Sequence, residues 1–295
     1  MNGRFFGGDA LAAHCDYLNV TIPFDQSGGV QDEVLVACGR AGIGGRVLDP
    51  GVFDCGGGTL WMRRRGQVLV VGVSGAALEM LRKVGAFNDL LWVLADRPHR
   101  VTRLDAAHDV PMEAGPELRR LFDLGNGEGI RLGQRRASVS LSGWKIGVAG
   151  HETGTLYVGT MQSEIRAKVY DKRQERIDRS FPDPGPLLRF EVTVTGKCGA
   201  SLRDAENPTG LFWHFAAPDL LCPPPGVILP AWVPGGVGFD LPGRFLLSPW
   251  DRLQHYLPDG EVMRVAVRLA DACGPSGREW LCKVIAELPE TASGG

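Results

Sequence analysis

The chain has 295 residues, of which 44% are hydrophobic and 22% charged, and its formal net charge at pH 7 is −2. A chain of this length and apolar content can bury a core, so the composition excludes a wholly disordered protein and predicts one large domain or two smaller ones. The small net charge argues against a protein that coats nucleic acid.

The apolar runs and the cysteines exclude further classes. The longest apolar run, 68–78, is interrupted by glycine and serine, so we expect a cytoplasmic protein without a membrane span. The seven cysteines are scattered without a C-x-x-C pair, and the six histidines stand far apart. Neither a disulfide framework nor a zinc site is therefore predicted.

Hydrophobic patterning in the first hundred residues predicts strands followed by two short helices. Alternation of apolar and polar residues indicates a strand that Pro23 ends, and then two strands that turn near Gly66 to form a hairpin. The predicted strands are 16–23, 59–65 and 67–74, and the predicted helices are 76–84 and 88–94.

The middle of the chain returns to strand patterns. These strands are 101–106, 137–142, 155–158, 165–172 and 187–195. Too few helices alternate with them for a doubly wound parallel sheet, which favours an α+β fold with a mostly antiparallel central sheet flanked by helices.

The last part of the chain differs in composition. Residues 218–249 are rich in proline and glycine, which predicts a linker or a loop packed against the core. Residues 250–295 contain two segments with helical spacing and predict a small C-terminal helical appendage. Residues 1–217 then form the main domain.

Two of the central strands place charged side chains on one face. Because side chains alternate along a strand, Arg103, Asp105 and Asp109 share a face, opposite Leu104 and Ala106. The same alternation on the strand 187–195 places Arg189 and Glu191 together. Each strand thus offers an arginine followed two residues later by a carboxylate.

A third strand places Arg166, Lys168, Tyr170 and Lys172 on one face. A phenol with a pKa near 10 is a poor nucleophile at neutral pH, but neighbouring positive charge favours the phenolate and binds a phosphate. Carboxylates of neighbouring strands could hold a divalent cation that polarises that phosphate. The same pattern is typical of a solvent-exposed strand, so the residue types alone leave both interpretations open.

Five segments between Asp16 and Ala200 occur in a characteristic order. They are 16–21, 101–109, 154–159 with Ser163, 169–172 with Glu175, and 188–192. This ordered set resembles the replication initiation factor family, the trans-acting initiators of rolling-circle plasmids and filamentous phages, with related relaxases of conjugative elements.

The resemblance implies that residues 1–217 nick DNA at a replication origin in a metal-dependent reaction. Tyr170 would attack the scissile phosphodiester, stay attached to the 5′ phosphate and free a 3′ hydroxyl for a polymerase. The implied ligands of Mg²⁺ or Mn²⁺ are Asp105 and Glu191, with Asp16 and Asp109 as further candidates. The side chains implied to steady the phosphate are Lys172 and Arg189.

Basic runs supply candidates for DNA binding. Arg63-Arg64-Arg65 is one run, and taken singly each run is also typical of a solvated surface. The candidates for binding DNA are Arg166 and Lys168, and from the run without acidic residues Arg135, Arg136 and Lys145.

The implied partners are origin DNA, supercoiled or single-stranded, and a host helicase and polymerase, with a homodimer left open. A conjugative relaxase, a DNA-binding protein without catalysis and a metal-dependent nuclease that uses water are the alternatives. The better-known single-strand nickases carry a His-hydrophobic-His pair, and its absence from this sequence fits a carboxylate metal site.

Overall fold

The computed structural model describes residues 11–39, 47–49, 51–55, 57–146 and 152–234. The chain divides after Leu18 and after Arg100 into two compact units. The first unit holds residues 11–18 and 101–234 of the described chain, and the second holds 19–100. Strand β1 (His14–Pro23) begins in the first unit and ends in the second.

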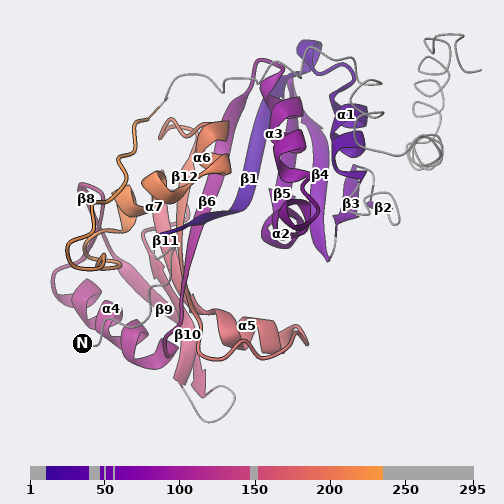
Figure 1. Ribbon diagram of the computed structural model, residues 1–295. Helices are drawn as coiled ribbons and strands as arrows, with labels where there is room; N and C mark the ends of the chain where they lie inside the picture. The colour runs from indigo at the N-terminus through magenta and orange to yellow at the C-terminus, as the bar shows by residue number, and fades with distance from the viewer. Residues whose placement is uncertain (1–10, 40–46, 50, 56, 147–151, 235–295) are drawn as a thin grey trace, which may run out of the picture. The chain divides into compact units, whose positions relative to one another are not determined.

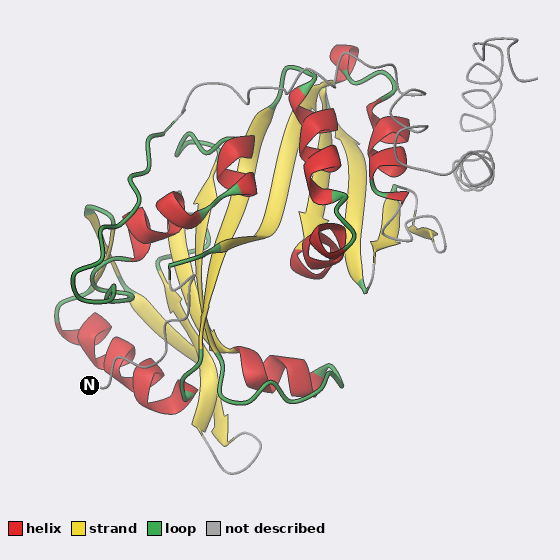
Figure 2. Cartoon of the chain, viewed as in Figure 1, coloured by secondary structure: helices red, strands yellow, loops and turns green. Residues whose placement is uncertain are grey.

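The first unit is built on an antiparallel sheet (Figures 1 and 2). Its strands lie in the spatial order β6–β12–β11–β10–β9, and each of these neighbouring pairs is antiparallel. The strands are β6 (Arg100–Val110), β9 (Val139–Ile146), β10 (Glu152–Val158), β11 (Ile165–Asp171) and β12 (Leu188–Thr195). A separate two-stranded sheet is formed by β7 (Ile130–Leu132) and β8 (Arg135–Ala137).

Helices cover the apolar face of this sheet. Helix α4 packs against β9 and β10, and α7 packs against β12. The rings of Phe212 and Trp213 on α7 each lie 5.4 Å from the ring of His108 on β6. The helices of the unit are α4 (Ala114–Gly127), α5 (Lys172–Asp178), α6 (Leu202–Glu206) and α7 (Thr209–Ala216).

The core under these helices follows from strand alternation. Phe190, Val192 and Val194 on β12 are fully buried. In the ladder, Phe190 pairs with Val169 of β11 on one side and with His108 of β6 on the other. The odd-numbered residues of β12 therefore face the other side of the sheet, where the charged side chains gather.

The second unit has its own antiparallel strands and helices. Its strands follow in the order β2–β3–β4–β5. Gly72 of β5 faces the indole of Trp61, because a Cβ at this glycine would come within 2.1 Å of the ring. The strands are β2 (Val47–Asp49), β3 (Val52–Cys55), β4 (Gly58–Arg65) and β5 (Val68–Ser74), and the helices are the 3-10 turn η1 (Phe24–Gln26), α1 (Val30–Ala37), α2 (Gly75–Lys83) and α3 (Phe87–Ala95).

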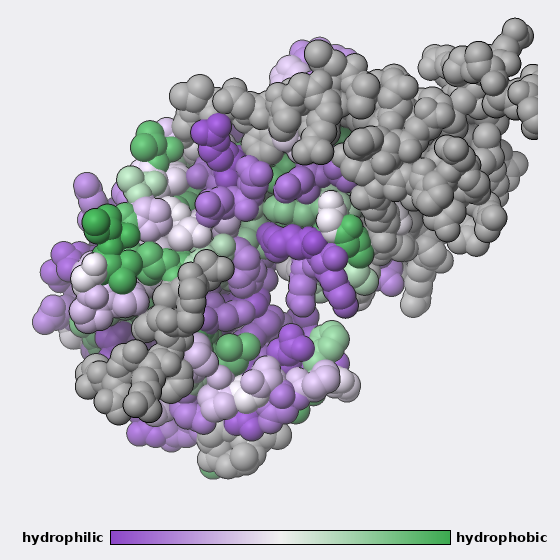
Figure 3. All heavy atoms as spheres, in the orientation of Figure 1, coloured by the Kyte–Doolittle hydropathy of each residue, from purple (hydrophilic) through white to green (hydrophobic). Residues whose placement is uncertain are grey.

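The segment after α7, residues 218–234, packs against α7 through Trp232. The ring of Trp232 lies 5.1 Å from that of His214 and 5.2 Å from that of Phe215. Val227, Ile228 and Val233 are exposed in this segment, and Figure 3 shows hydrophobic side chains gathered over it. Residues 218–234 form no helix or strand. The rest of the predicted linker and the helical appendage, 235–295, lie outside the described residues.

The predicted fold class is confirmed: the protein is α+β with a mostly antiparallel sheet. The predicted hairpin near Gly66 and the helices 76–84 and 88–94 are present as β4–β5, α2 and α3. The helices α1 and α4 to α7 are not anticipated by the sequence analysis. No helix within the described ranges is long and apolar enough to cross a membrane.

One predicted strand ends earlier than expected. Lys172 was predicted to continue β11, but it is the first residue of α5. The carboxylate of Asp171 accepts a hydrogen bond from the backbone N–H of Gln174 at 2.9 Å and so caps the helix. A carboxylate at this position stabilises a helix start, which is why the strand stops there.

Phe190→Ala tests how much the buried face of β12 contributes to the stability of the protein. We expect Phe190→Ala to lower the free energy of unfolding by about 3–5 kcal/mol, because it leaves a cavity under α7. Phe181→Ala is the matched control, since that ring is 52% exposed. Urea unfolding measures both, and equal stabilities for the two variants would contradict this packing.

Candidate active site

Strand register brings the charged residues of three strands into rows across one face of the sheet. Tyr170 of β11 pairs with Arg189 of β12, and Arg189 pairs with Asp109 of β6. The next rows are Lys168 with Glu191, and Arg166 with Thr193 and Asp105. The predicted shared faces on β6, β11 and β12 are confirmed, except for Lys172.

Arg189 is the centre of the first row. The residue is 7% exposed, and its guanidinium donates from Nε and Nη2 to both oxygens of Asp109, at 2.6 and 2.7 Å. It also donates from Nη1 to Asp16 of β1 at 2.7 Å. Burial opposes ionisation of both carboxyls, but the charge of Arg189, with smaller contributions from Lys172 and His14, lowers the pKa of Asp16 and of Asp109, and for Asp109 the hydrogen bonds of Arg189 add to this. All three groups are therefore charged at neutral pH.

Glu191 on β12 is almost fully buried, with only 1% of its surface exposed. Its Oε1 is 2.7 Å from the ammonium of Lys168. Burial raises the pKa of Glu191 to about 8, and the charges of Asp105 and Asp16 add to this against the opposing charge of Lys168. The other oxygen, Oε2, is buried and has no hydrogen-bond partner among the described residues. At neutral pH this carboxyl is therefore largely protonated, and a bound cation would displace the proton and occupy the unpartnered oxygen.

Asp105 is held by its own strand. Arg103, two residues earlier, donates from Nε to Oδ1 of Asp105 at 2.9 Å, and Asp105 is 2% exposed. The guanidinium of Arg103 also stacks on Tyr17, with 4.2 Å between Cζ and the ring centre. The arginine-x-carboxylate pattern on this strand therefore forms an intrastrand ion pair.

Tyr170 stands among these charges with two lysines beside its ring. The ammonium groups of Lys168 and Lys172 lie 5.1 and 5.8 Å from the ring centre. Burial nevertheless raises the pKa of Tyr170 above its ordinary value, with Glu191 adding to the effect and the charge of Arg189 opposing it. The charge of Arg189 thus favours the phenolate, as expected of a neighbouring cation, but burial outweighs it in the free protein.

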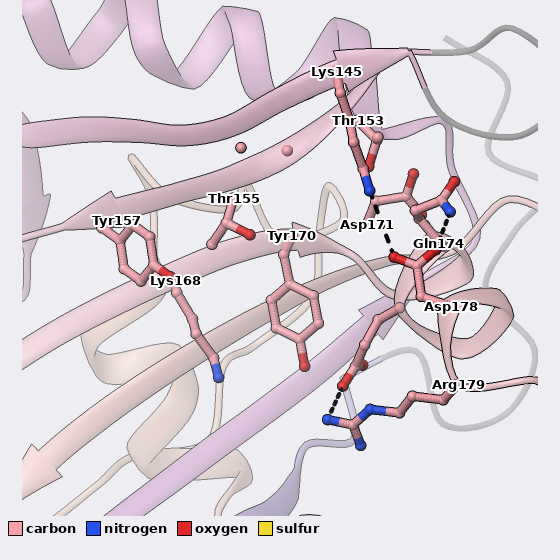
Figure 4. A pocket seen from close by; sticks show the side chains of 13 residues that line it. Lys145, Thr153, Thr155, Tyr157, Lys168, Tyr170, Asp171, Gln174, Asp178 and Arg179 are labelled. Carbon is pink, nitrogen blue, oxygen red and sulfur yellow. Dashed lines mark hydrogen bonds and ion pairs between the residues drawn. The ribbon is translucent and has the colours of Figure 1, made fainter.

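Tyr170 and Lys168 line a pocket of about 460 Å³ in the first unit. Figure 4 shows Lys168, Tyr170 and Arg179 pointing to the same side of this pocket. Arg179 pairs with Glu175 at 3.0 Å. The other walls of the pocket are formed by Thr155 and Tyr157 of β10 and by Gln174, Glu175, Asp178 and Arg179 at α5. Thr155, Tyr157 and Glu175 lie in the segments of the sequence that occur in a characteristic order, but none of these six residues was predicted to belong to the site. Only the strand register and the early start of α5 reveal these residues.

The predicted DNA-binding residues separate into two groups. Lys145 lines the pocket and pairs with Asp178 at 3.6 Å, and Arg166 lies in the third row and donates to the backbone oxygen of Met161 at 3.1 Å. Arg135 and Arg136 instead lie on β8, outside the pocket. Lys145 thus shares the pocket with Tyr170, whereas Arg166 lies two rows away on the same strand.

The four predicted metal ligands do not form one cluster. No three His, Cys, Asp or Glu side chains in the described part of the chain come close enough to hold one ion. Asp16 and Asp109 face Arg189, and Asp105 faces Arg103. Glu191, with its unpartnered Oε2, fits a cation that takes one protein carboxylate and completes its shell with water and a phosphate, as Mg²⁺ often does.

Similarity to known proteins is found among solved structures. No family model matches the sequence, and no curated protein matches it. The chain is similar to the solved structure of a rolling circle replication initiator protein from Geobacillus stearothermophilus, with 16% sequence identity and a TM-score of 0.42 over 62% of this chain and 74% of that one.

Because its pKa is raised, Tyr170 is expected to contribute no absorbance change in an alkaline titration. An ordinary tyrosine ionises as the pH rises through about 10, whereas Tyr170 keeps its proton there. We expect the absorbance increase at 295 nm between pH 9 and 11 to be the same in the wild type and in Tyr170→Phe. A loss of about a quarter of the change, the share of one of four tyrosines, would contradict this.

Proposed function

We propose that this chain cuts one strand of DNA by attack of Tyr170 on a phosphodiester, as an initiator of rolling-circle replication. The observation that carries the proposal is the position of Tyr170: a pocket-lining phenol flanked by two lysines and paired in register with a buried arginine. Such an arrangement presents a nucleophile and phosphate-binding cations to one ligand.

The cations around Tyr170 suit a phosphate that arrives with its own negative charge. In the free protein Lys168 is paired with Glu191 and Lys172 with Glu175. Lys168 is 35% exposed while Glu191 is 1% exposed, so the lysine can turn to a phosphate without moving the buried strand. A phosphate in the pocket then competes with the carboxylates for the lysines, and binding is coupled to rearrangement of these ion pairs.

The proposed reaction is a transesterification. The phenolic oxygen of Tyr170 forms a bond to phosphorus as the bond from phosphorus to the 3′ oxygen breaks. The phenolic proton passes to water, and the departing 3′ oxygen takes up a proton to become a 3′ hydroxyl. The 5′ phosphate stays on Tyr170, which conserves the bond energy for rejoining, and the 3′ hydroxyl serves as a primer. Arg189 stabilises the phenolate that forms, because its charge lowers the pKa of Tyr170.

Glu191 is the proposed protein ligand for Mg²⁺ or Mn²⁺. The negative charges of Asp105 and Asp16 also act on the carboxyl of Glu191. A bound divalent cation would polarise the scissile phosphate and relieve the repulsion among these carboxylates. Asp109 has both oxygens on Arg189, so we assign it to positioning the arginine.

Tyr170→Phe tests the nucleophile. We expect the variant to bind DNA but to give no nicked circles from a supercoiled plasmid that carries the gene for this chain and its flanking sequence, with Mn²⁺ present. Tyr157→Phe is the matched control, because Tyr157 lines the same pocket and is 40% exposed. Agarose gels measure both reactions, and nicking by Tyr170→Phe at the wild-type rate would refute tyrosine chemistry and favour a nuclease that uses water.

Glu191→Gln tests the cation. The substitution keeps the size of the side chain and removes the charge that would hold the ion, so we expect cleavage to fall about 100-fold or more at millimolar Mn²⁺. Glu164→Gln, on a carboxylate outside the pocket, should cleave normally. The assignment fails if Glu191→Gln cleaves like the wild type, or if the wild type cleaves with all metal chelated.

A further inference from the structure

The tip of the β4–β5 hairpin carries three consecutive arginines, Arg63, Arg64 and Arg65. The turn between the strands is two residues long, since Arg65 pairs with Val68. Gly66 takes the first turn position with a φ of 59°, which favours glycine and makes a tight hairpin. The backbone N–H of Phe24 donates to the carbonyl of Gln67 at 2.9 Å and ties the tip to η1. The arginines therefore stand on a short, anchored ribbon.

Two of the three guanidinium groups are held by aromatic rings. The Cζ of Arg64 lies 3.8 Å from the ring centre of Phe24, and its Nε donates to the carbonyl of Gly66 at 3.0 Å. The Cζ of Arg65 lies 5.9 Å from the ring centre of Trp61. A stacked guanidinium keeps N–H groups at its edge for an anion and loses little freedom on binding, which favours arginine as a phosphate ligand.

The charge of this tip is not balanced within the hairpin. Residues 58–74 contain no aspartate or glutamate, and residues 63–67 are all exposed. In the described part of the chain, neither Arg64 nor Arg65 forms an ion pair with a carboxylate. The lysines and Arg189 around Tyr170 differ, because each is paired with an acidic side chain.

We propose that the tip residues Arg63, Arg64 and Arg65 form a second DNA contact, which binds the phosphates of duplex DNA. The inference rests on the proposed function in taking DNA as the substrate, and goes beyond it in assigning a binding role to the second unit. Alternation places Arg64 on one face of the ribbon and Arg63 and Arg65 on the other. A two-stranded ribbon fits the major groove of a duplex, where cations on its two faces meet the backbones that border the groove.

Phosphate contacts of this kind make affinity depend on salt. Each neutralised phosphate of duplex DNA contributes about 0.9 to the slope of log K against log salt concentration. Three arginines at the tip should therefore contribute between about two and three units of slope, without preference for sequence.

The test measures binding of the full chain to a 30-base-pair duplex of random sequence by fluorescence anisotropy, across a range of NaCl concentrations. The variant Arg63→Gln/Arg64→Gln/Arg65→Gln should bind about 10-fold or more weakly at 0.1 M salt, with the slope reduced by about two to three units. The control Arg119→Gln/Arg120→Gln/Arg203→Gln removes three charges from helices of the first unit and should keep the wild-type slope. The triple lysine variant at positions 63–65 should keep the slope, because it retains the charges.

The inference is overturned if the glutamine variant keeps the wild-type slope, or if the lysine variant loses it, since the effect would then come from altered packing. It is also overturned if the glutamine variant loses binding to phosphatidylglycerol vesicles while binding the duplex normally. The glutamine variant should still form a covalent adduct with single-stranded DNA through Tyr170. Failure of tyrosine chemistry would leave the duplex measurement unaffected, so the two proposals fail separately.

Discussion

A guanidinium buried between two carboxylates organises the charged face of the first unit. Arg189 joins β12 to β6 through Asp109 and to β1 through Asp16, with three hydrogen bonds between 2.6 and 2.7 Å. Removing one partner of such a network leaves an uncompensated buried charge, which typically costs about 3–5 kcal/mol. The positions of Asp16 and Asp109 relative to each other therefore depend on this arginine.

Around Arg189 the protein balances positive and negative charges closely. Lys168 and Lys172 lie beside the ring of Tyr170, but Glu191 and Glu175 pair with them. Burial then dominates, and the phenol keeps its proton in the free protein. A site of this kind becomes reactive when a ligand changes the balance. A DNA phosphate that draws the lysines away, and a cation that neutralises Glu191, would both act on the same group of charges.

The sequence predicts which face of the sheet each site residue lies on, but not how deeply its side chain is buried. Alternation places Tyr170, Arg189 and Glu191 on the charged face, because the strand period is two and these strands are regular. The pairing of Tyr170 with Arg189 follows from long-range register, which alternation cannot supply. The unpartnered Oε2 of Glu191 and the raised pKa of Tyr170 depend on burial by other strands.

Helix α4 shows why some helices are not predicted from the sequence pattern. It contains Gly115, Gly125 and Gly127, which lower helix propensity. A Cβ at Gly115 would come within 2.9 Å of Glu152, and one at Gly125 within 2.3 Å of Val139. Glycine is needed here for close packing on β9 and β10, so the tertiary structure removes the local helix signal. Helix α7 is not predicted for a different reason: it is apolar on nearly all sides, so its sequence shows no amphipathic periodicity.

The most direct test of the central claim is the identity of the residue that becomes attached to DNA. The wild-type chain is incubated with Mn²⁺ and a pool of single-stranded fragments that span its gene and the flanking sequence, then digested with nuclease and trypsin for mass spectrometry. The account predicts a nucleotide 5′ phosphate on the peptide that contains Tyr170. A phosphotyrosine link at any other tyrosine, or cleaved DNA without a covalent adduct, would contradict it.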